Sequence, residues 1–182
     1  TPLEELESTF LAQSPDLAVA GAGQGRIQPA WVALVEILAR IESEPYHWPV
    51  GRTTFQKLAY FATAAGLPTG LVFSRGSYGP YAPNLKPRIT QLVNNGLIRE
   101  ERLGQMFVVK AGPTSEDARK TYKLDIEGLK PTIERVTDLF LRMRTSQAEV
   151  AATVHFACES LTKELGEKPS EREVLSYVME WK

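Results

Sequence analysis

The spacing of hydrophobic residues predicts a mainly helical chain from Pro29 onward. Apolar side chains recur every three or four residues after Pro29, which places them on one face of a helix that ends before Pro45. A second helix is expected from Thr53, with Gln56 completing a capping box, and should close at Gly66.

A third helix and a β-hairpin are expected next. Asn84 is suited to cap the helix, which should cover residues 84–95. Its inward-facing residues are expected to be Ile89, Leu92 and Val93. Residues 97–101 and 106–109 should pair as strands around a tight turn. Three helices and a hairpin is the order of a winged helix-turn-helix, so we expect a mainly α fold with a small β-hairpin or sheet: a winged-helix-like core plus C-terminal helices.

Weaker patterns predict further short strands and three C-terminal helices. Residues 71–73 and 121–124 read as short strands, and residues 111–118 as a polar loop. The expected caps of the last three helices are Asp125, Ser146 with Glu149, and Ser170 with Glu173.

The composition divides the chain near Pro29. Residues 14–28 are rich in glycine and alanine, so residues 1–28 are expected to be an N-terminal segment and linker, and residues 29–182 the globular domain. The 182 residues are 43% hydrophobic and 24% charged, which is ordinary for a globular protein. No apolar run approaches the roughly 20 residues that span a bilayer, and the N-terminus is acidic, so we expect a cytoplasmic protein.

The charge is unevenly distributed along the chain. Residues 1–49 carry a net charge of −5, residues 50–110 carry +6 and residues 111–182 carry −2. A basic middle third could attract phosphates or an acidic protein surface. The alternative is a solvated surface with a local imbalance, and charge alone favours this alternative.

One pair of residues, a thiol and an imidazole, could form a nucleophilic site. His155 and Cys158 are three residues apart on a predicted helix and share one face. Their neighbours Val154 and Leu161 are apolar, which favours a hydrogen-bonded core histidine beside a buried thiol. With one cysteine, two histidines and no phosphate loop or nucleophile elbow, we expect no catalytic residue, cofactor or metal site.

The segment Arg75–Tyr81 has the composition of an interface loop. Arginine and tyrosine dominate the binding energy of many protein interfaces, while glycine and proline define the shape of a loop. The alternative is a structural turn whose tyrosines pack on the second helix. The candidate partner-binding residues are Arg75, Ser77, Tyr78, Tyr81, Lys86 and Arg88.

Three segments together resemble one known family. They are Lys57-Leu58-Ala59-Tyr60-Phe61-Ala62, Tyr78-Gly79-Pro80-Tyr81 and Thr153-Val154-His155-Phe156. Residues 29–182 resemble the C-terminal, toxin-binding domain of the DarG antitoxins, which is similar to the SocA-like (Panacea) antitoxin domains.

The resemblance implies a function that depends on protein contact. DarG antitoxins carry an N-terminal macrodomain that removes ADP-ribose from DNA, and the macrodomain would lie in cis upstream of residues 1–28. Their partner, the DarT toxin, uses NAD to ADP-ribosylate thymidine in single-stranded DNA. The resemblance therefore implies a non-enzymatic domain that binds DarT as a 1:1 heterodimer and blocks its DNA site, by steric cover with local help from acidic side chains.

A DNA-binding role is the competing hypothesis. An autoregulatory winged helix would place helix 84–95, with Lys86 and Arg88, against the duplex, and Arg99 and Arg102 on the wing. The near-neutral net charge of −1 does not favour direct nucleic-acid binding, so this hypothesis ranks second.

Overall fold

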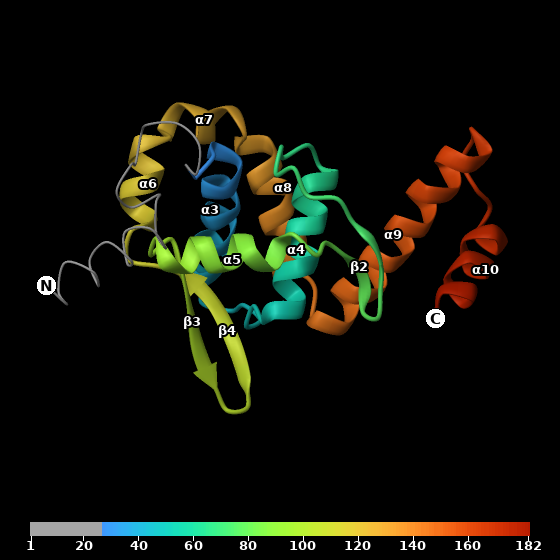
Figure 1. Cartoon of the computed structure of the whole chain (residues 1–182), viewed down its shortest axis with the longest axis horizontal. Helices are drawn as coiled ribbons and strands as arrows, with labels where there is room; N and C mark the ends of the chain where they lie inside the picture. Colours follow the sequence, from blue (N-terminus) through green and yellow to red (C-terminus); the bar gives the residue numbers. More distant parts are fainter. Residues whose placement is uncertain (1–26) are drawn as a thin grey trace, which may run out of the picture.

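The computed structural model describes residues 27–182, and in this range it contains eight helices and two β-hairpins (Figure 1). The predicted fold class, mainly α with a small β component, is confirmed. Residues 1–26, which hold most of the expected linker, lie outside the described residues. In chain order the elements are α3 (Pro29–Ser43), α4 (Arg52–Ala64), β1 (Ser74–Gly76), β2 (Gly79–Tyr81), α5 (Leu85–Asn94), β3 (Ile98–Leu103), β4 (Met106–Ala111), α6 (Ser115–Thr121), α7 (Lys123–Gly128), α8 (Lys130–Leu141), α9 (Thr145–Leu165) and α10 (Glu171–Trp181).

Helix α3 is the centre of the fold. Pro29 occupies its first turn, where the missing N–H has no helical acceptor and the fixed φ suits a helix. Every residue from Ala30 to Leu38 is buried, because α6, α7, α8 and β4 all pack against this helix. The sequence predicted one buried face, whereas the surrounding elements cover this part of α3 on all sides (Figure 1).

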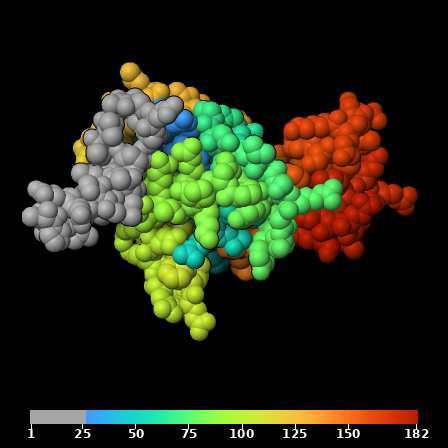
Figure 2. All heavy atoms as spheres, viewed as in Figure 1, coloured from blue at the N-terminus to red at the C-terminus, as the bar shows by residue number. Residues whose placement is uncertain are grey.

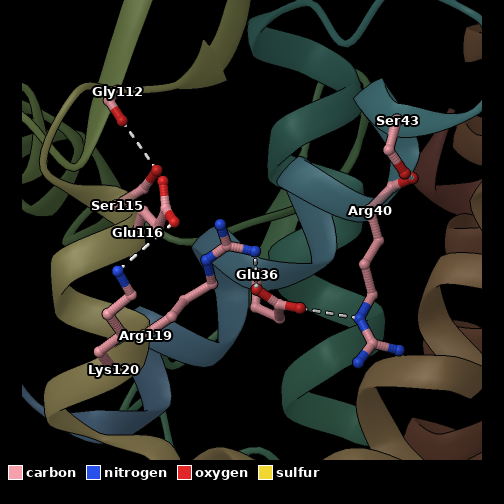
Figure 3. A network of polar contacts seen from close by, with 8 residues as sticks. All are labelled: Glu36, Arg40, Ser43, Gly112, Ser115, Glu116, Arg119 and Lys120. Carbon is pink, nitrogen blue, oxygen red and sulfur yellow. Dashed lines mark hydrogen bonds and ion pairs between the residues drawn. The ribbon is translucent and has the colours of Figure 1, made fainter.

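A polar contact fixes α6 against this central helix. The carboxylate of Glu36, on α3, is only 7% exposed and accepts hydrogen bonds from two arginines (Figure 3). Arg40 Nε lies 2.9 Å from Glu36 Oε1, and Arg119 Nη1, on α6, lies 3.0 Å from Glu36 Oε2. A buried carboxylate with charged donors on both oxygens is stabilised against the cost of burial.

The hydrophobic core joins α3 to both halves of the chain. Its largest fully buried side chains are Phe55, Leu34, Ile37, Leu38, Ile41, Leu58, Leu67, Leu85, Leu92, Ile98, Ile133 and Val32. These residues come from α3, α4, α5, β3 and α8 and from the segment that follows α4, so elements distant in sequence share one core.

The β3–β4 hairpin confirms the predicted pair of strands. Ile98 pairs with Ala111 and Leu103 with Met106, and the turn is made by Gly104, with φ of +64°, and Gln105. The hairpin is attached to the α3–α4 connection, since the Val109 N–H donates to Val50 O at 2.7 Å. The order of three helices followed by a hairpin is therefore present, with the additional β1–β2 hairpin between α4 and α5.

Helices α9 and α10 form a helical hairpin that stands beside the main body (Figure 2). Gly166, with φ of +73°, ends α9 in a left-handed cap. The predicted capping box at the start of α10 is confirmed, because Ser170 Oγ accepts from the Glu173 N–H at 3.2 Å and Glu173 Oε2 accepts from the Ser170 N–H at 2.7 Å. No residue of α10 is fully buried, so this helix is held by a few contacts rather than by a core.

Two predicted strands and one predicted loop are wrong. Residues 71–73 are not in a strand. The strand begins at Ser74, which pairs with Tyr81, and the chain after Tyr81 continues toward α5 instead of extending the pairing. Residues 111–118 and 121–124 belong in large part to α6 and α7. Acids in the first turn of α6 and bases in its last turn favour a helix, and both helices pack against α3.

Three predicted caps are also wrong, by two to four residues. Helices α4 and α9 have Gly51 and Arg144 at the N-cap, so Thr53 and Ser146 lie inside the first turn. Gly51 pairs with Val108 as an extended bridge, which fixes where the chain can become helical.

The third predicted cap is wrong, and so is the prediction that Val93 faces inward. Asp125 lies within α7, and the next helix begins at Lys130 instead. Val93, expected to face inward, is 38% exposed because it lines a surface groove.

Candidate protein-binding site

The segment predicted as an interface loop is a short β-hairpin with an exposed tip. Gly76 pairs with Gly79, and Ser77 and Tyr78 form the two-residue turn between them. Tyr78 is 66% exposed and Tyr81 is 41% exposed. The alternative in which both tyrosines pack into the core beside α4 does not fit these exposures.

A buried lysine of α4 holds the backbone of this hairpin. Lys57 is only 2% exposed, and its Nζ donates to Pro80 O at 2.9 Å. Burial lowers the pKa of Lys57 to about 8; the nearby Glu149 carboxylate opposes this effect and the Lys182 ammonium adds to it. The charge of this lysine is thus poorly compensated within the domain.

Gly79 allows the hairpin to approach α9 and α4 closely. Its φ is +101°, which disfavours any residue with a side chain. A Cβ at this position would lie 2.8 Å from Thr153 Oγ1, on α9, and 3.4 Å from Lys57 Nζ. Glycine is therefore required by both the backbone conformation and the packing.

His155 supports the same region from α9. Its Nδ1 lies 2.6 Å from the hydroxyl oxygen of Tyr60, and the two rings are in edge contact. Burial raises the pKa of Tyr60 above its ordinary range. Cys158 is half-buried and free. His155 is hydrogen-bonded as predicted, but His155 and Cys158 are only half-buried and Val154 is 43% exposed, so the expectation of a core histidine beside a buried thiol is wrong in its burial.

Helix α10 holds the hairpin from its other side. Arg75 lies over the ring of Tyr177 at 4.0 Å, and its Nε donates to the Tyr177 hydroxyl at 3.0 Å. Trp181 Nε1 donates to Gly76 O, and Lys182 Nζ donates to Ser77 O, each at 3.0 Å. The hairpin is thus fixed between α4 and α9 on one side and α10 on the other.

A groove with a volume of about 740 Å³ lies between α4, α5 and this hairpin; we call it the hairpin groove. Its lining residues are Arg52, Thr53, Gln56, Lys57, Gly76, Ser77, Tyr78, Gly79, Tyr81, Lys86, Ile89, Thr90, Val93 and Glu100. Four of the six predicted site residues are among them: Ser77, Tyr78, Tyr81 and Lys86.

The other two predicted residues, Arg75 and Arg88, do not line the groove. Arg75 is used in the contact with α10 described above. Arg88 Nη1 donates to Gln91 Oε1 at 3.0 Å, and its guanidinium lies 5.9 Å from the ring centre of Trp31.

Sequence reasoning missed the residues that α4 contributes to the groove. Arg52, Thr53, Gln56 and Lys57 are spaced as neighbours on one helical face, and this spacing was the available signal. Arg52 forms a double hydrogen bond to Glu100, with Nε–Oε1 and Nη2–Oε2 distances of 3.1 and 2.8 Å.

Two kinds of feature are absent from the part of the chain that the structure describes. Within residues 27–182, no group of three or more histidine, cysteine, aspartate or glutamate side chains is arranged to hold a metal ion. In the same range, no helix has both the length and the apolar character needed to cross a membrane.

Comparisons with known proteins assign no family to the chain. No protein-family model matches it, and no curated protein matches it. The structure does bring together the three segments on which the resemblance to DarG domains depends, through the contacts of Lys57 with Pro80 and of Tyr60 with His155 and the close approach of Gly79 to Thr153.

Proposed function

We propose that this domain is an antitoxin module that binds a DarT-type DNA ADP-ribosyltransferase and neutralises it by protein–protein contact. The observation that carries the proposal is the exposed tyrosine pair on a backbone that is held from both sides. Tyr78 and Tyr81 project from a hairpin whose carbonyl groups are bound by Lys57, Trp181 and Lys182.

A rigid aromatic hairpin is an effective binding element. Exposed tyrosines bury a large area when a partner covers them, and they often dominate the binding energy of an interface. Because the hairpin is already ordered in the free domain, binding does not have to order it, which lowers the entropy cost of association.

The proposed mode of inhibition is steric cover of the single-stranded DNA site in a 1:1 complex. A DNA-binding surface is basic, so the basic hairpin groove would not be the part that faces it. Acidic side chains of α10, such as Glu171 and Glu180, are better suited, and α10 lies against the hairpin through Trp181. The domain would act in the cytoplasm without a cofactor, linked in cis to a macrodomain.

Winged-helix DNA binding is the weaker candidate. The wing arginines are engaged within their own hairpin: Arg99 pairs with Glu101, and Arg102 Nε donates to Gly104 O at 3.1 Å. The Arg99–Glu101 ion pair reduces the positive charge that the wing presents to a phosphate backbone, and the bond to Gly104 O restrains the Arg102 side chain at its own turn.

Co-purification with the DarT-type toxin encoded beside the gene tests the proposal. We expect a stable complex and loss of DNA modification by the bound toxin. The double variant Tyr78→Ala/Tyr81→Ala should weaken binding by about a hundredfold, as for two aromatic hot-spot residues, with an unchanged unfolding transition. Tyr46→Ala is the matched control, since Tyr46 is 92% exposed and lies outside the groove.

Two results would contradict the proposal. The first is the absence of a complex with the toxin. The second is a complex in which the toxin still binds and modifies single-stranded DNA at its normal rate. If the double variant lost its fold, the hairpin tyrosines would be structural, and binding would have to be retested with Tyr78→Ala alone.

A further inference from the structure

We propose that the hairpin groove binds an extended acidic segment of the protein partner. The inference deepens the proposed function and rests on it, because it assigns the groove to a part of the toxin outside its basic DNA-binding surface. The argument uses the charge of the groove, one unpartnered acceptor in its wall, and its size and rim.

The charge of the groove is complementary to an acidic ligand. Its charged lining residues are Arg52, Lys57, Lys86 and Glu100. Arg52 and Glu100 neutralise each other through their double hydrogen bond. The two lysines are left as the excess charge, one exposed at the rim and one buried in the wall.

The buried lysine would gain most from an anion. Its ammonium has been removed from water and donates to the neutral carbonyl of Pro80. A carboxylate brought close to Lys57 in a partly enclosed site interacts more strongly than one in bulk water. Glu149 is the acid that influences Lys57 within the domain, and Lys182 acts in the opposite direction.

The wall of the groove also contains an acceptor that needs a donor. Gln56 Oε1 is buried and has no hydrogen-bond partner among the described residues. A buried acceptor without a donor is unfavourable, so a ligand N–H that reaches this oxygen after a small turn of the Gln56 side chain gains from the contact. Backbone N–H groups recur along a peptide, whereas a nucleic acid offers N–H donors only on its bases and none on its phosphodiester backbone. The backbone of a peptide lying along the groove is therefore better matched to Gln56 than the backbone of a nucleic acid.

The size and rim of the groove suit an extended segment. A volume of about 740 Å³ is within the usual range for ligand sites. Tyr78 and Tyr81 stand at the hairpin side, and Ile89 and Val93 supply apolar contacts from α5. In an acidic segment with interspersed apolar residues, the acids would face the lysines of the groove, and the apolar residues would pack against the tyrosines and the apolar side chains of α5.

The first arm of the test measures binding of the catalytically inactivated toxin to the whole chain. Lys86→Glu should weaken binding by about tenfold or more because it reverses the charge of the rim, and Lys86→Arg should preserve it. Lys123→Glu is the matched control on α7, an exposed lysine outside the groove, and should change binding less than about twofold. Gln56→Met should weaken binding by about fivefold without lowering the stability of the free domain, since it removes an unpaired buried acceptor.

The second arm does not require the toxin. It titrates the whole chain with an end-capped octapeptide that alternates aspartate and glycine, with its asparagine analogue, and with a single-stranded thymidine octanucleotide. We expect the acidic peptide to bind more tightly than its analogue, with a dependence on Lys86, and the oligonucleotide to show no such dependence.

The two arms separate the failure of this inference from failure of the proposed function. If the toxin binds and Lys86→Glu behaves like Lys123→Glu, the groove assignment is wrong while the antitoxin role stands. If no toxin complex forms, the antitoxin role is wrong, and the peptide titration alone decides the groove. Equal binding of the two peptides, or Lys86-dependent binding of the oligonucleotide alone, would overturn the inference.

Discussion

Lys57 has several structural roles. It begins the α4 segment Lys57–Ala62, it holds the β1–β2 hairpin, and it contributes charge to the hairpin groove. A lysine that is 2% exposed is costly to bury in its charged form. Its long side chain reaches Pro80 O, so the same atom that is desolvated also fixes the hairpin. The buried charge of Lys57 thus lowers the stability of the domain, while its hydrogen bond orders the hairpin.

The stability of the domain should rise between about pH 8 and pH 10. Burial lowers the pKa of Lys57 from 10.5 to about 8 in the folded state, so in this range the unfolded chain binds the proton more tightly. As the pH rises, the unfolded chain loses this proton and the stabilisation that the proton gave it. The free energy of unfolding should therefore increase by roughly 2 kcal/mol. Above about pH 10 the raised pKa of Tyr60 acts in the opposite direction, because the unfolded tyrosine ionises first.

Urea unfolding at half-unit pH intervals measures this effect. Lys57→Met should abolish the rise, and Lys123→Met, at an exposed position, should preserve it. A rise of the same size in Lys57→Met would show that another group is responsible.

Helix α10 illustrates how an element without a core can still position a site. None of its residues is fully buried, yet Tyr177, Trp181 and the terminal Lys182 contact Arg75, Gly76 and Ser77. Phe156 of α9 packs against Trp181 with the two rings tilted, and their centres are 5.4 Å apart. The helix therefore depends on its cap and its aromatic end for its place against the hairpin.

Removing the cap of α10 should loosen the helix and the hairpin together. Ser170→Ala deletes a side-chain acceptor at the helix start, which typically costs about 1 kcal/mol. Because α10 has no core, we expect faster amide hydrogen exchange throughout α10 and in residues 74–81, with little change in α3. Ser176→Ala, at an exposed position within α10, is the control. Exchange that increases only in α10 would show that the hairpin is ordered without it.

At the scale of the whole molecule, the basic middle of the chain is divided among several surfaces. Lys57 and Lys86 face the groove, Arg75 contacts α10, and Arg99 and Lys110 pair with Glu101. A charge of +6 in the sequence of residues 50–110 therefore does not form one continuous positive face suited to a duplex.

We accordingly expect only weak binding to duplex DNA. At physiological salt the dissociation constant should be in the non-specific range, about 10⁻⁴ to 10⁻⁶ M, for any sequence. A fluorescence-anisotropy titration at several salt concentrations measures the affinity and its slope. Nanomolar, sequence-dependent binding that is lost in Lys86→Glu and Arg102→Glu would establish the winged-helix DNA-binding alternative instead.

The sequence by itself determined the elements whose signals are local. The start of α3 at Pro29, the start of α5 after Asn84, the β3–β4 pair and the capping box at Ser170 all depend on residues within a few positions of one another. Local steric and hydrogen-bonding preferences are sufficient to fix such features. The candidate site was found in part for the same reason, because tyrosine, glycine and arginine are concentrated in residues 75–81.

The contacts between segments that are distant in the sequence were decided only by the tertiary structure. The burial of α3 on all sides, the helices in place of a strand at residues 121–124, and the start of α4 directly after Gly51 follow from packing and from the bridge to Val108. The hairpin groove is of the same kind, since α4, α5 and the hairpin contribute to it from residues 52–100. Contacts between residues tens of positions apart leave no periodic trace in the sequence, so the spacing of Gln56 and Lys57 places them on one face of a helix but does not show that this face lines a groove.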